Sequence, residues 1–242
     1  MNVIIGRKPV LEALNSDEEI SQVYILYGQQ GGIINAIRVA AKKRGIKVNQ
    51  IPLDKFKQIT KDKVSQGVAA VKSDYKFFNL HKIIDEAKKS EYPLLLVLDS
   101  IQDTHNVGAI LRSAECSGVD GLIITKHNSA PINETVVKTS AGASEYVKIA
   151  QVNNLVHAIE ELKQNGFWIV GSYLEGAKDY ISVDYKMPIA LIVGNEEKGI
   201  RKLTADKCDH LVSIPMKGKI QSLNVSVATG IMLFEILKQR SI

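Results

Sequence analysis

The first third of the chain alternates short apolar runs with amphipathic stretches. This pattern predicts strands at 20–26, 46–51 and 67–71, with helices at 33–45 and 53–60 between them. Gly45 stands at the end of the first helix, where glycine commonly terminates helices. Residues 1–72 are therefore expected to form a small α/β unit. Residues 73–90 lose the alternation and are predicted to be a linker that contains a helix from about 79 to 89.

A stronger alternation begins after Pro93. LLLVLD (94–99) is apolar throughout, as in strands that are buried on both faces of a parallel sheet. Further strands are predicted at 121–125, 146–150, 167–172, 189–195 and 210–215, and helices at 106–118, 133–144, 154–166 and from about Asn224 onward. Residues 91–242 are therefore expected to form a mainly parallel sheet with helices on both faces.

Composition narrows the class of protein. The chain is 45% hydrophobic and 24% charged, and it contains no apolar run close to the roughly 18–20 residues that cross a bilayer. Its first residues lack the features of a signal peptide. Cys116 and Cys208 lie in unrelated segments without metal-ligand spacing. A cytoplasmic protein without metal, disulfide or membrane segment is expected.

The positive charge is confined to the first third. Residues 1–72 hold 12 Lys+Arg against 6 Asp+Glu, whereas residues 73–242 hold 19 against 20. A basic module joined to a near-neutral one is typical of a polyanion-binding domain attached to a domain with another task. A solvated lysine-rich surface explains the charge equally well.

Three turns of the second region combine glycine with amide or carboxylate side chains, each where a predicted strand ends. They are SIQDTHNVGAILR, NEEKGI and MKGKIQSLN. Asn106 and Asn224 each suit a helix N-cap, which is the simplest explanation of either one alone. Ligands of parallel sheets gather beyond the carboxyl ends of the strands, so the three turns together favour one binding site.

Several common sites are disfavoured. The chain contains no GxGxxG, no GxxxxGK[ST] and no GxSxG, and its five histidines are scattered. A nucleotide-dependent oxidoreductase, a P-loop enzyme and a serine hydrolase are therefore poorly supported.

A family resemblance adds to this. NVGAILRSAECSG, LIVGNEEKGI and IPMKGKIQSLNVSVA resemble the three motifs of the SpoU (TrmH-like) class of RNA ribose 2′-O-methyltransferases, in the SPOUT superfamily. IIGRKPVLEAL and QGVAAV resemble the substrate-binding domain of that family, whose fold is similar to a ribosomal protein of the L30e type. Ser65 precedes the latter segment, where relatives often have His, and this difference bears on substrate choice.

The resemblance implies a deep trefoil knot in the second domain, a homodimer formed through that domain, and S-adenosylmethionine (SAM) as cofactor. By motif position, the catalytic residues would be Asn106, Arg112, Glu196 and Asn224. The cofactor-binding residues would be Gly194, Ile214, Ser222 and Leu223, with Thr139 and Gly142 from the TSAGA turn.

The implied substrate is RNA, with a guanosine of 23S ribosomal RNA preferred. Arg7, Lys8, Lys42, Lys43 and Arg44 are candidates for contacts with RNA phosphates, which position RNA without reading its sequence. Two alternatives stay open: a tRNA 2′-O-methyltransferase of the same class, and a non-catalytic RNA-binding member.

Overall fold

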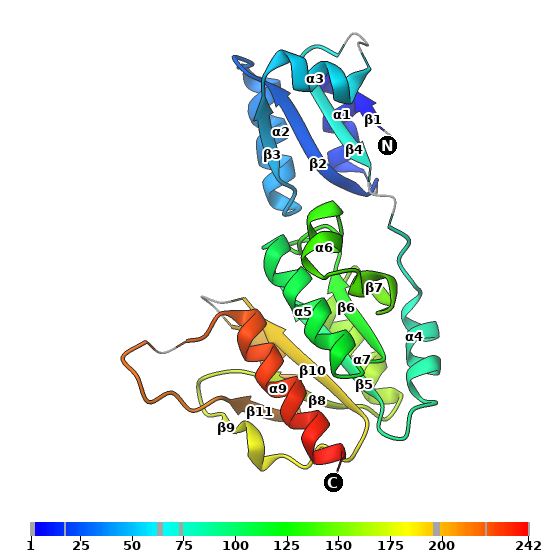
Figure 1. Cartoon of the computed structure of the whole chain (residues 1–242), viewed down its shortest axis with the longest axis vertical. Helices are drawn as coiled ribbons and strands as arrows, with labels where there is room; N and C mark the ends of the chain where they lie inside the picture. Colours follow the sequence, from blue (N-terminus) through cyan, green and yellow to red (C-terminus); the bar gives the residue numbers. More distant parts are fainter. Residues whose placement is uncertain are drawn as a thin grey trace. The chain divides into compact units, whose positions relative to one another are not determined.

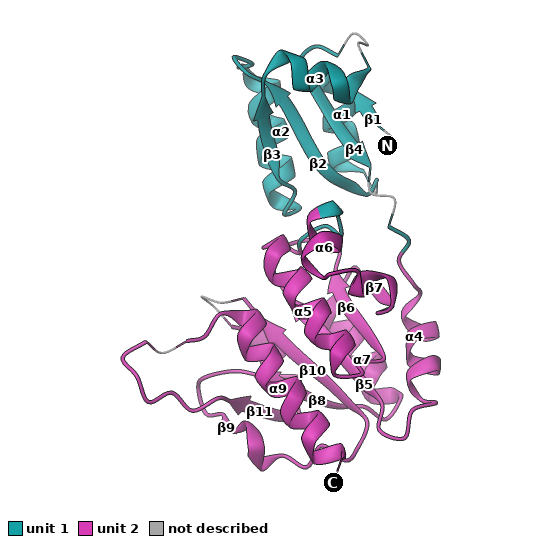
Figure 2. Ribbon diagram, in the orientation of Figure 1, with its two compact units in different colours: residues 1–76, 130–134 teal, residues 77–129, 135–242 magenta. Residues whose placement is uncertain are grey.

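The chain folds into two compact units (Figure 2). The computed structural model describes residues 3–16, 18–61, 65–72, 75–195, 199–220 and 222–241. Unit 1 comprises residues 1–76 and 130–134, and unit 2 comprises residues 77–129 and 135–242.

Unit 1 is a mixed four-stranded sheet with helices. Its strands are β1 (Val3–Ile5), β2 (Ile20–Leu26), β3 (Val48–Ile51) and β4 (Val68–Lys72), and its helices are α1 (Arg7–Asn15), α2 (Gly32–Lys43) and α3 (Leu53–Thr60). The strand order is β1-β4-β2-β3; β2 and β3 are parallel, and β4 is antiparallel to both neighbours. The strands and helices predicted between residues 20 and 71 are confirmed to within two residues, whereas β1 and α1 were not predicted.

The core of unit 1 follows from two periodicities. Alternate residues of β2, Val23 and Ile25, point to one face of the sheet, and Ile34, Ile37 and Ala41 of α2 repeat at helical spacing. These side chains are buried together with residues of α1.

The position of Arg44, just after α2, contradicts one of the predictions. The residue is only 8% exposed, and its guanidinium donates hydrogen bonds to the carbonyl oxygens of Ala13, Leu14, Ser16 and Glu18 at 2.6–3.2 Å. The last carbonyls of a helix lack intrahelical donors, and a positive charge there interacts favourably with the helix dipole. Arg44 thus holds the end of α1, and its predicted contact with RNA phosphate is wrong.

Unit 2 is built on a seven-stranded sheet. Its strands are β5 (Leu94–Asp99), β6 (Gly121–Thr125), β7 (Ile149–Val152), β8 (Trp168–Ser172), β9 (Lys178–Asp179), β10 (Ile189–Gly194) and β11 (His210–Ser213). Its helices are α4 (Leu80–Ala87), α5 (Thr104–Cys116), α6 (Glu134–Thr139), α7 (Leu155–Gln164), α8 (Lys202–Ala205) and α9 (Val225–Arg240), with 3₁₀ turns η1 (Ala143–Glu145) and η2 (Tyr180–Ser182). The order is β7-β6-β5-β10-β8-β11-β9, and every neighbouring pair is parallel. The predicted α/β class with a parallel sheet is confirmed.

Helices cover both faces of this sheet. α5 packs against α9 on one face (Figure 1), whereas α4 and α7 are buried with residues of the other face, among them Leu95 and Val97 of β5. The predicted helix near 79–89 is present as α4, and its Ile83 and Ile84 belong to the core of unit 2. Within the described residues, no helix is both long and apolar enough to span a membrane.

The strand order creates a crevice between β5 and β10. From β5 the chain adds β6 and β7 on one side, and it then crosses to build β8 on the other side. The carboxyl ends of β5 and β10 lie side by side, since Asp99 pairs with Gly194. Such a switch point is where open parallel sheets bind ligands.

Candidate active site

Two asparagines from different helices meet in unit 2. Asn106 lies in the first turn of α5, and Asn224 is the N-cap of α9. Nδ2 of Asn224 donates to Oδ1 of Asn106 at 3.0 Å. Oδ1 of Asn224 accepts from the backbone N–H of Ser226 at 2.9 Å and from its hydroxyl at 2.6 Å. The cap interaction therefore fixes the Asn224 amide, which in turn holds Asn106.

The predicted cap role holds for Asn224 and is wrong for Asn106. The N-cap of α5 is Asp103, whose Oδ1 accepts the N–H groups of His105 at 2.7 Å and Asn106 at 2.9 Å. Asp is as strong an N-cap as Asn, and it comes first along the chain. Because α5 begins earlier than predicted, the Asn106 side chain contacts Asn224 and does not cap its own helix.

A cavity of about 300 Å³ lies beyond the carboxyl ends of β8, β10 and β11. Its walls come from the turns after these strands and from the first two turns of α9. The lining residues are Ser172, Tyr173, Leu174, Glu175, Val193, Gly194, Asn195, Gly199, Ser213, Ile214, Met216, Ser222, Leu223, Val225, Ala228 and Met232. Four residues of the predicted cofactor set, Gly194, Ile214, Ser222 and Leu223, are among them. Asn224 stands between two lining residues, at the same end of α9.

Gly194 is glycine because another part of the chain occupies the space of a side chain. A Cβ there would lie 2.1 Å from the carbonyl carbon of Gly199 and 2.2 Å from the nitrogen of Ile200. The N–H of Gly199 donates to the carbonyl of Asn195 at 2.7 Å. The chain thus leaves β10 and returns directly against its end. Glu196, a predicted catalytic residue, lies outside the described residues.

Thr139 and Gly142 do not line this cavity. The turn after α6 instead packs against α5, where a Cβ on Gly108 would meet the Cβ of Thr139 at 2.6 Å and the nitrogen of Ser140 at 3.1 Å. The glycine of the NVGA segment therefore permits contact between α5 and this turn, and the structure gives no support to a cofactor contact of Thr139 or Gly142.

Arg112 does not share the position of the asparagine pair within one chain. It lies six residues after Asn106 on α5, which is about 9 Å along the axis and roughly 120° around it. Its side chain is exposed. One chain therefore joins Asn106 to Asn224 and leaves Arg112 to face outward.

Some residues that line the cavity were not predicted from the sequence. Tyr173, Leu174 and Glu175 follow β8, and the signal was available, because this strand also ends at the carboxyl edge of the sheet. Among the lining residues that the structure describes, Glu175 brings a carboxylate and the others are apolar or neutral polar groups. Such a lining suits a ligand with an apolar part and a positive charge.

Cys208 lies outside the lining of this cavity, and its thiol is not activated. Burial, with a smaller contribution from Asp209, raises the pKa of the Cys208 thiol to about 12, and the thiol donates to the carbonyl of Thr204 at 3.3 Å. A thiol of this pKa stays protonated at neutral pH and is a poor nucleophile. Among the described residues, no group of three His, Cys, Asp or Glu side chains is placed to hold a metal ion.

Comparison with known proteins identifies the family. Residues 93–234 match the SpoU rRNA Methylase family, and residues 3–78 match the family described as RNA 2′-O ribose methyltransferase substrate binding. The chain is 36% identical over 239 residues to YacO of Bacillus subtilis, whose name places it in the TrmH family of tRNA/rRNA methyltransferases; the match covers 98% of this chain and 96% of YacO.

This chain belongs to the SpoU rRNA methylase family.

Solved structures agree with this membership. An AdoMet-bound rRNA methyltransferase from Sinorhizobium meliloti matches with a TM-score of 0.64 and 27% identity, over 98% of this chain and 86% of that one. The TrmH/SpoU tRNA modifying enzyme of A. aeolicus matches with a TM-score of 0.59 and 34% identity, over 67% and 82%. The SpoU-type fold thus occurs in enzymes named for both classes of RNA.

The contact at Gly194 predicts a specific loss of stability. Gly194→Ala should destabilise unit 2 by about 2 kcal/mol or more, because its methyl group collides with backbone that has no flexible side chain to move. Denaturant unfolding followed by the fluorescence of Trp168, the single tryptophan of the chain, measures this in unit 2.

Gly218→Ala is the matched control, because a Cβ at Gly218 meets no atom within 4 Å. It should change stability by less than about 0.5 kcal/mol. Equal unfolding midpoints for the two variants would contradict the close approach at Gly194.

Proposed function

We propose that this chain methylates the ribose 2′-hydroxyl of a guanosine in 23S ribosomal RNA, using SAM. The RNA 2′-O-methyltransferase class follows from membership of the SpoU family. The carrying observation is the Asn106–Asn224 pair, which lies at the end of α9 that borders the cavity. The similarity to the Sinorhizobium meliloti enzyme, which is named as an rRNA methyltransferase, supports an rRNA substrate. The similarity to the A. aeolicus enzyme, which is named for tRNA, supports the alternative.

The cavity suits SAM on chemical grounds. Val193, Ile214 and Leu223 offer an apolar wall to a purine ring, and Gly194 lies beside them at the end of β10. The carboxylate of Glu175 complements a cationic ligand. When bound, SAM supplies a methyl group activated by a sulfonium sulfur.

The reaction joins the ribose 2′-oxygen to the methyl carbon while the carbon–sulfur bond breaks, and the hydroxyl proton must leave. We assign to Asn106 and Asn224 the orientation of that hydroxyl, because amide groups donate and accept hydrogen bonds but do not take up protons at neutral pH. Glu196 is our candidate for the proton acceptor, a role worth about 10²–10⁴-fold in rate. Arg112, whose planar guanidinium offers several hydrogen-bond donors, would bind the neighbouring phosphate and stabilise negative charge on the oxygen.

A homodimer accounts for the outward position of Arg112. Val227 and Phe234, seven residues apart on one face of α9, are 50% and 47% exposed, and α9 packs beside α5, which carries Arg112. Apolar side chains on a helix next to the site suit the matching face of a second copy. In this arrangement Arg112 would act at the site of the partner.

Unit 1 presents two separate basic ends to RNA. Arg7 is linked to Gln29 through Nη2 and to the Gln66 carbonyl at 3.1 Å through Nε, which places it beside the turn before α2. Lys42 and Lys43 lie at the opposite end of α2, about 18 Å away for a helix of 12 residues. The predicted RNA-binding residues therefore do not form one patch.

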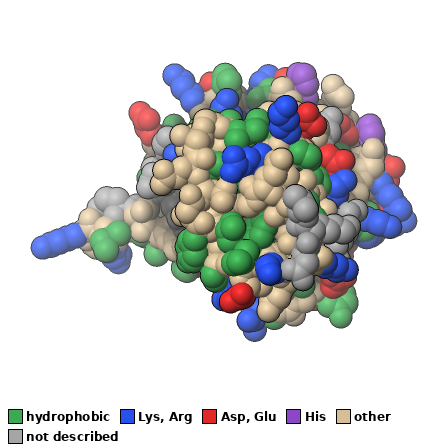
Figure 3. Space-filling model, turned by 90° about the horizontal axis from the view of Figure 1, so that it is seen from above, with side chains coloured by type: hydrophobic (Ala, Val, Ile, Leu, Met, Phe, Trp, Pro, Cys, Tyr) green, Lys and Arg blue, Asp and Glu red, His purple; other side chains and the backbone are tan. Residues whose placement is uncertain are grey.

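We favour the end that carries Arg7 and Lys8. A polar cavity of about 400 Å³ lies there, lined by Gly28, Gln29, Gln30, Gly31, Ile34, Asn35, Arg38 and Gln50. Amide and guanidinium groups of this kind bind bases and phosphates of single-stranded RNA. Figure 3 shows Lys and Arg side chains standing among polar side chains and backbone on the face in view, beside a hydrophobic area.

Three further expectations stay predictions within this proposal. They are the deep trefoil knot, the division into residues 1–72, 73–90 and 91–242, and a cytoplasmic location.

Mapping of RNA methylation tests the function. Cells that lack this protein should lose one 2′-O-methyl group from 23S ribosomal RNA, and the wild-type chain should restore it. Asn224→Ala should restore less than about 1% of the wild-type rate, because the hydroxyl loses its oriented partner. Loss of a tRNA methyl group would establish the alternative substrate, and unchanged maps of both RNA classes would refute the proposal.

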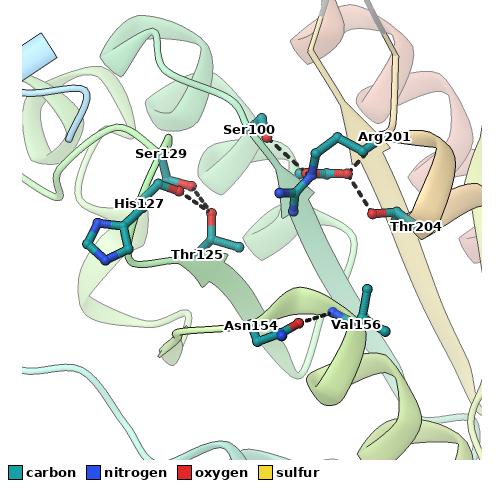
Figure 4. A network of polar contacts seen from close by, with 9 residues as sticks. Ser100, Thr125, His127, Ser129, Asn154, Val156, Arg201 and Thr204 are labelled. Carbon is teal, nitrogen blue, oxygen red and sulfur yellow. Dashed lines mark hydrogen bonds and ion pairs between the residues drawn. The ribbon is translucent and has the colours of Figure 1, made fainter. Parts of the chain in front are cut away.

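Asn154→Ala controls for the loss of a helix cap in Asn224→Ala. Asn154 caps α7 by accepting from the N–H of Val156 at 2.9 Å (Figure 4) and from that of His157 at 3.3 Å, and it lies outside the site. Both variants should cost about 0.5–2 kcal/mol in stability. Asn154→Ala should nevertheless restore methylation.

A pair of double variants distinguishes the two basic ends of unit 1. Arg7→Ala with Lys8→Ala should weaken RNA binding about tenfold at low salt and leave SAM affinity unchanged, because phosphate contacts lie in unit 1. Lys42→Ala with Lys43→Ala should change RNA affinity by less than about threefold. If the second pair has the larger effect, the assignment of the RNA-binding end is wrong.

A further inference from the structure

Asp99 is a buried carboxylate that the proposed chemistry does not use. The residue is 0% exposed at the last position of β5. Its Oδ2 accepts from the N–H of Arg201 and the hydroxyl of Thr204, both at 2.9 Å, and its Oδ1 accepts from Ser100 at 3.0 Å. The Nε of Arg201 lies 2.7 Å from Oδ1. A buried charge costs several kcal/mol unless it is paired and fully hydrogen-bonded, as Asp99 is.

Three of these four hydrogen-bond donors belong to Arg201 and Thr204, in the segment that follows β10. Figure 4 shows Arg201 and Thr204 on one side of this network of contacts and Ser100 on the other. Arg201 comes two residues after Gly199, which lines the cavity, and one residue after Ile200, which is buried. Asp99 thus links the segment from Gly199 to Thr204 to β5, the strand next to β10.

This anchor also fills the switch-point crevice. Ligands of parallel sheets usually bind where the strand order reverses, which here is between β5 and β10. Asp99, Arg201 and Thr204 occupy that place with a closed set of hydrogen bonds. The cavity lies instead at the ends of β8, β10 and β11.

We propose that Asp99 and Arg201 are positioning residues that hold the backbone of Gly199 and Ile200 against Gly194, in the form that binds SAM. The proposal rests on the proposed function of the cavity. A loop that is already ordered loses less conformational entropy when it binds a ligand, so the anchor raises affinity without touching the ligand. It should act on SAM binding and not on the methyl transfer step.

Asp99→Asn tests this directly. All four groups around the carboxylate are donors, so an amide NH₂ in place of one oxygen meets a donor and the charge on Arg201 loses its partner. Isothermal titration with SAM should give a dissociation constant raised at least about tenfold. In steady-state assays the KM for SAM should rise by a similar factor, with kcat at saturating SAM within about twofold of wild type and the KM for RNA unchanged.

Arg201→Gln keeps the test decisive if Asp99→Asn fails to fold. The Arg201 side chain is 51% exposed, so its replacement should leave a cooperatively folded protein. It retains the backbone N–H to Asp99 and loses the ion pair, and SAM affinity should fall about threefold to tenfold. Arg201→Lys, which restores the charge without the Nε geometry, should recover part of that loss.

Glu160→Gln is the matched control. The Glu160–Lys207 ion pair, at 2.8 Å, also links the segment after α8 to α7, but both side chains are more than 40% exposed. Its loss should leave SAM affinity within twofold of wild type.

The outcomes separate this inference from the proposed function. If folded Asp99→Asn or Arg201→Gln binds SAM as tightly as wild type, or loses kcat with unchanged SAM affinity, the positioning role is refuted and the function stands. If the wild-type chain itself binds no SAM, the proposed function fails first.

Discussion

The return of the chain against the end of β10 is the constraint on which the rest of unit 2 depends. Gly199 and Ile200 pass so close to Gly194 that no side chain fits there. This contact closes one wall of the cavity, and the same returning segment supplies the donors that neutralise buried Asp99. Gly194, the segment from Gly199 to Thr204 and the carboxylate of Asp99 are thus held together at one edge of the parallel sheet.

The start of α9 joins structural and chemical roles in one side chain. Asn224 must be oriented to cap its helix, and that orientation points its Nδ2 at Asn106. Because Asp103 caps α5, Asn106 is available for this contact. The geometry of two helix starts therefore places two amides next to a cavity, while Arg112 faces outward, where a second copy of the chain would meet it. The function that we propose uses all three features.

Much of the fold could be predicted from local pattern, and the failures have physical causes. LLLVLD indicates a strand buried on both faces, and Asn224 before an apolar helix indicates a cap; both are confirmed. Arg44 was misassigned because a basic run says nothing about where a guanidinium folds back, and here it meets the carbonyls at the end of α1. Asp99 was overlooked because a carboxylate at a strand end is equally typical of an exposed turn.

Only some residues of the candidate site were predicted, because the connections between strands and helices decide which residues meet. Gly194, Ile214, Ser222 and Leu223, which the family resemblance implied as cofactor contacts, line the cavity because the turns that carry them lie at strand ends that meet at one edge. Thr139 is the last residue of α6, and its neighbour in space is Gly108, a contact that sequence separation conceals.

Amide hydrogen exchange of the wild-type chain with and without SAM tests the central claim most directly. Slower exchange in the presence of SAM is expected in residues 193–195, 199–201, 213–216 and 222–225, which border the cavity, with no change in residues 3–72. Protection confined to unit 1, or none in the four segments at saturating SAM, would contradict the account.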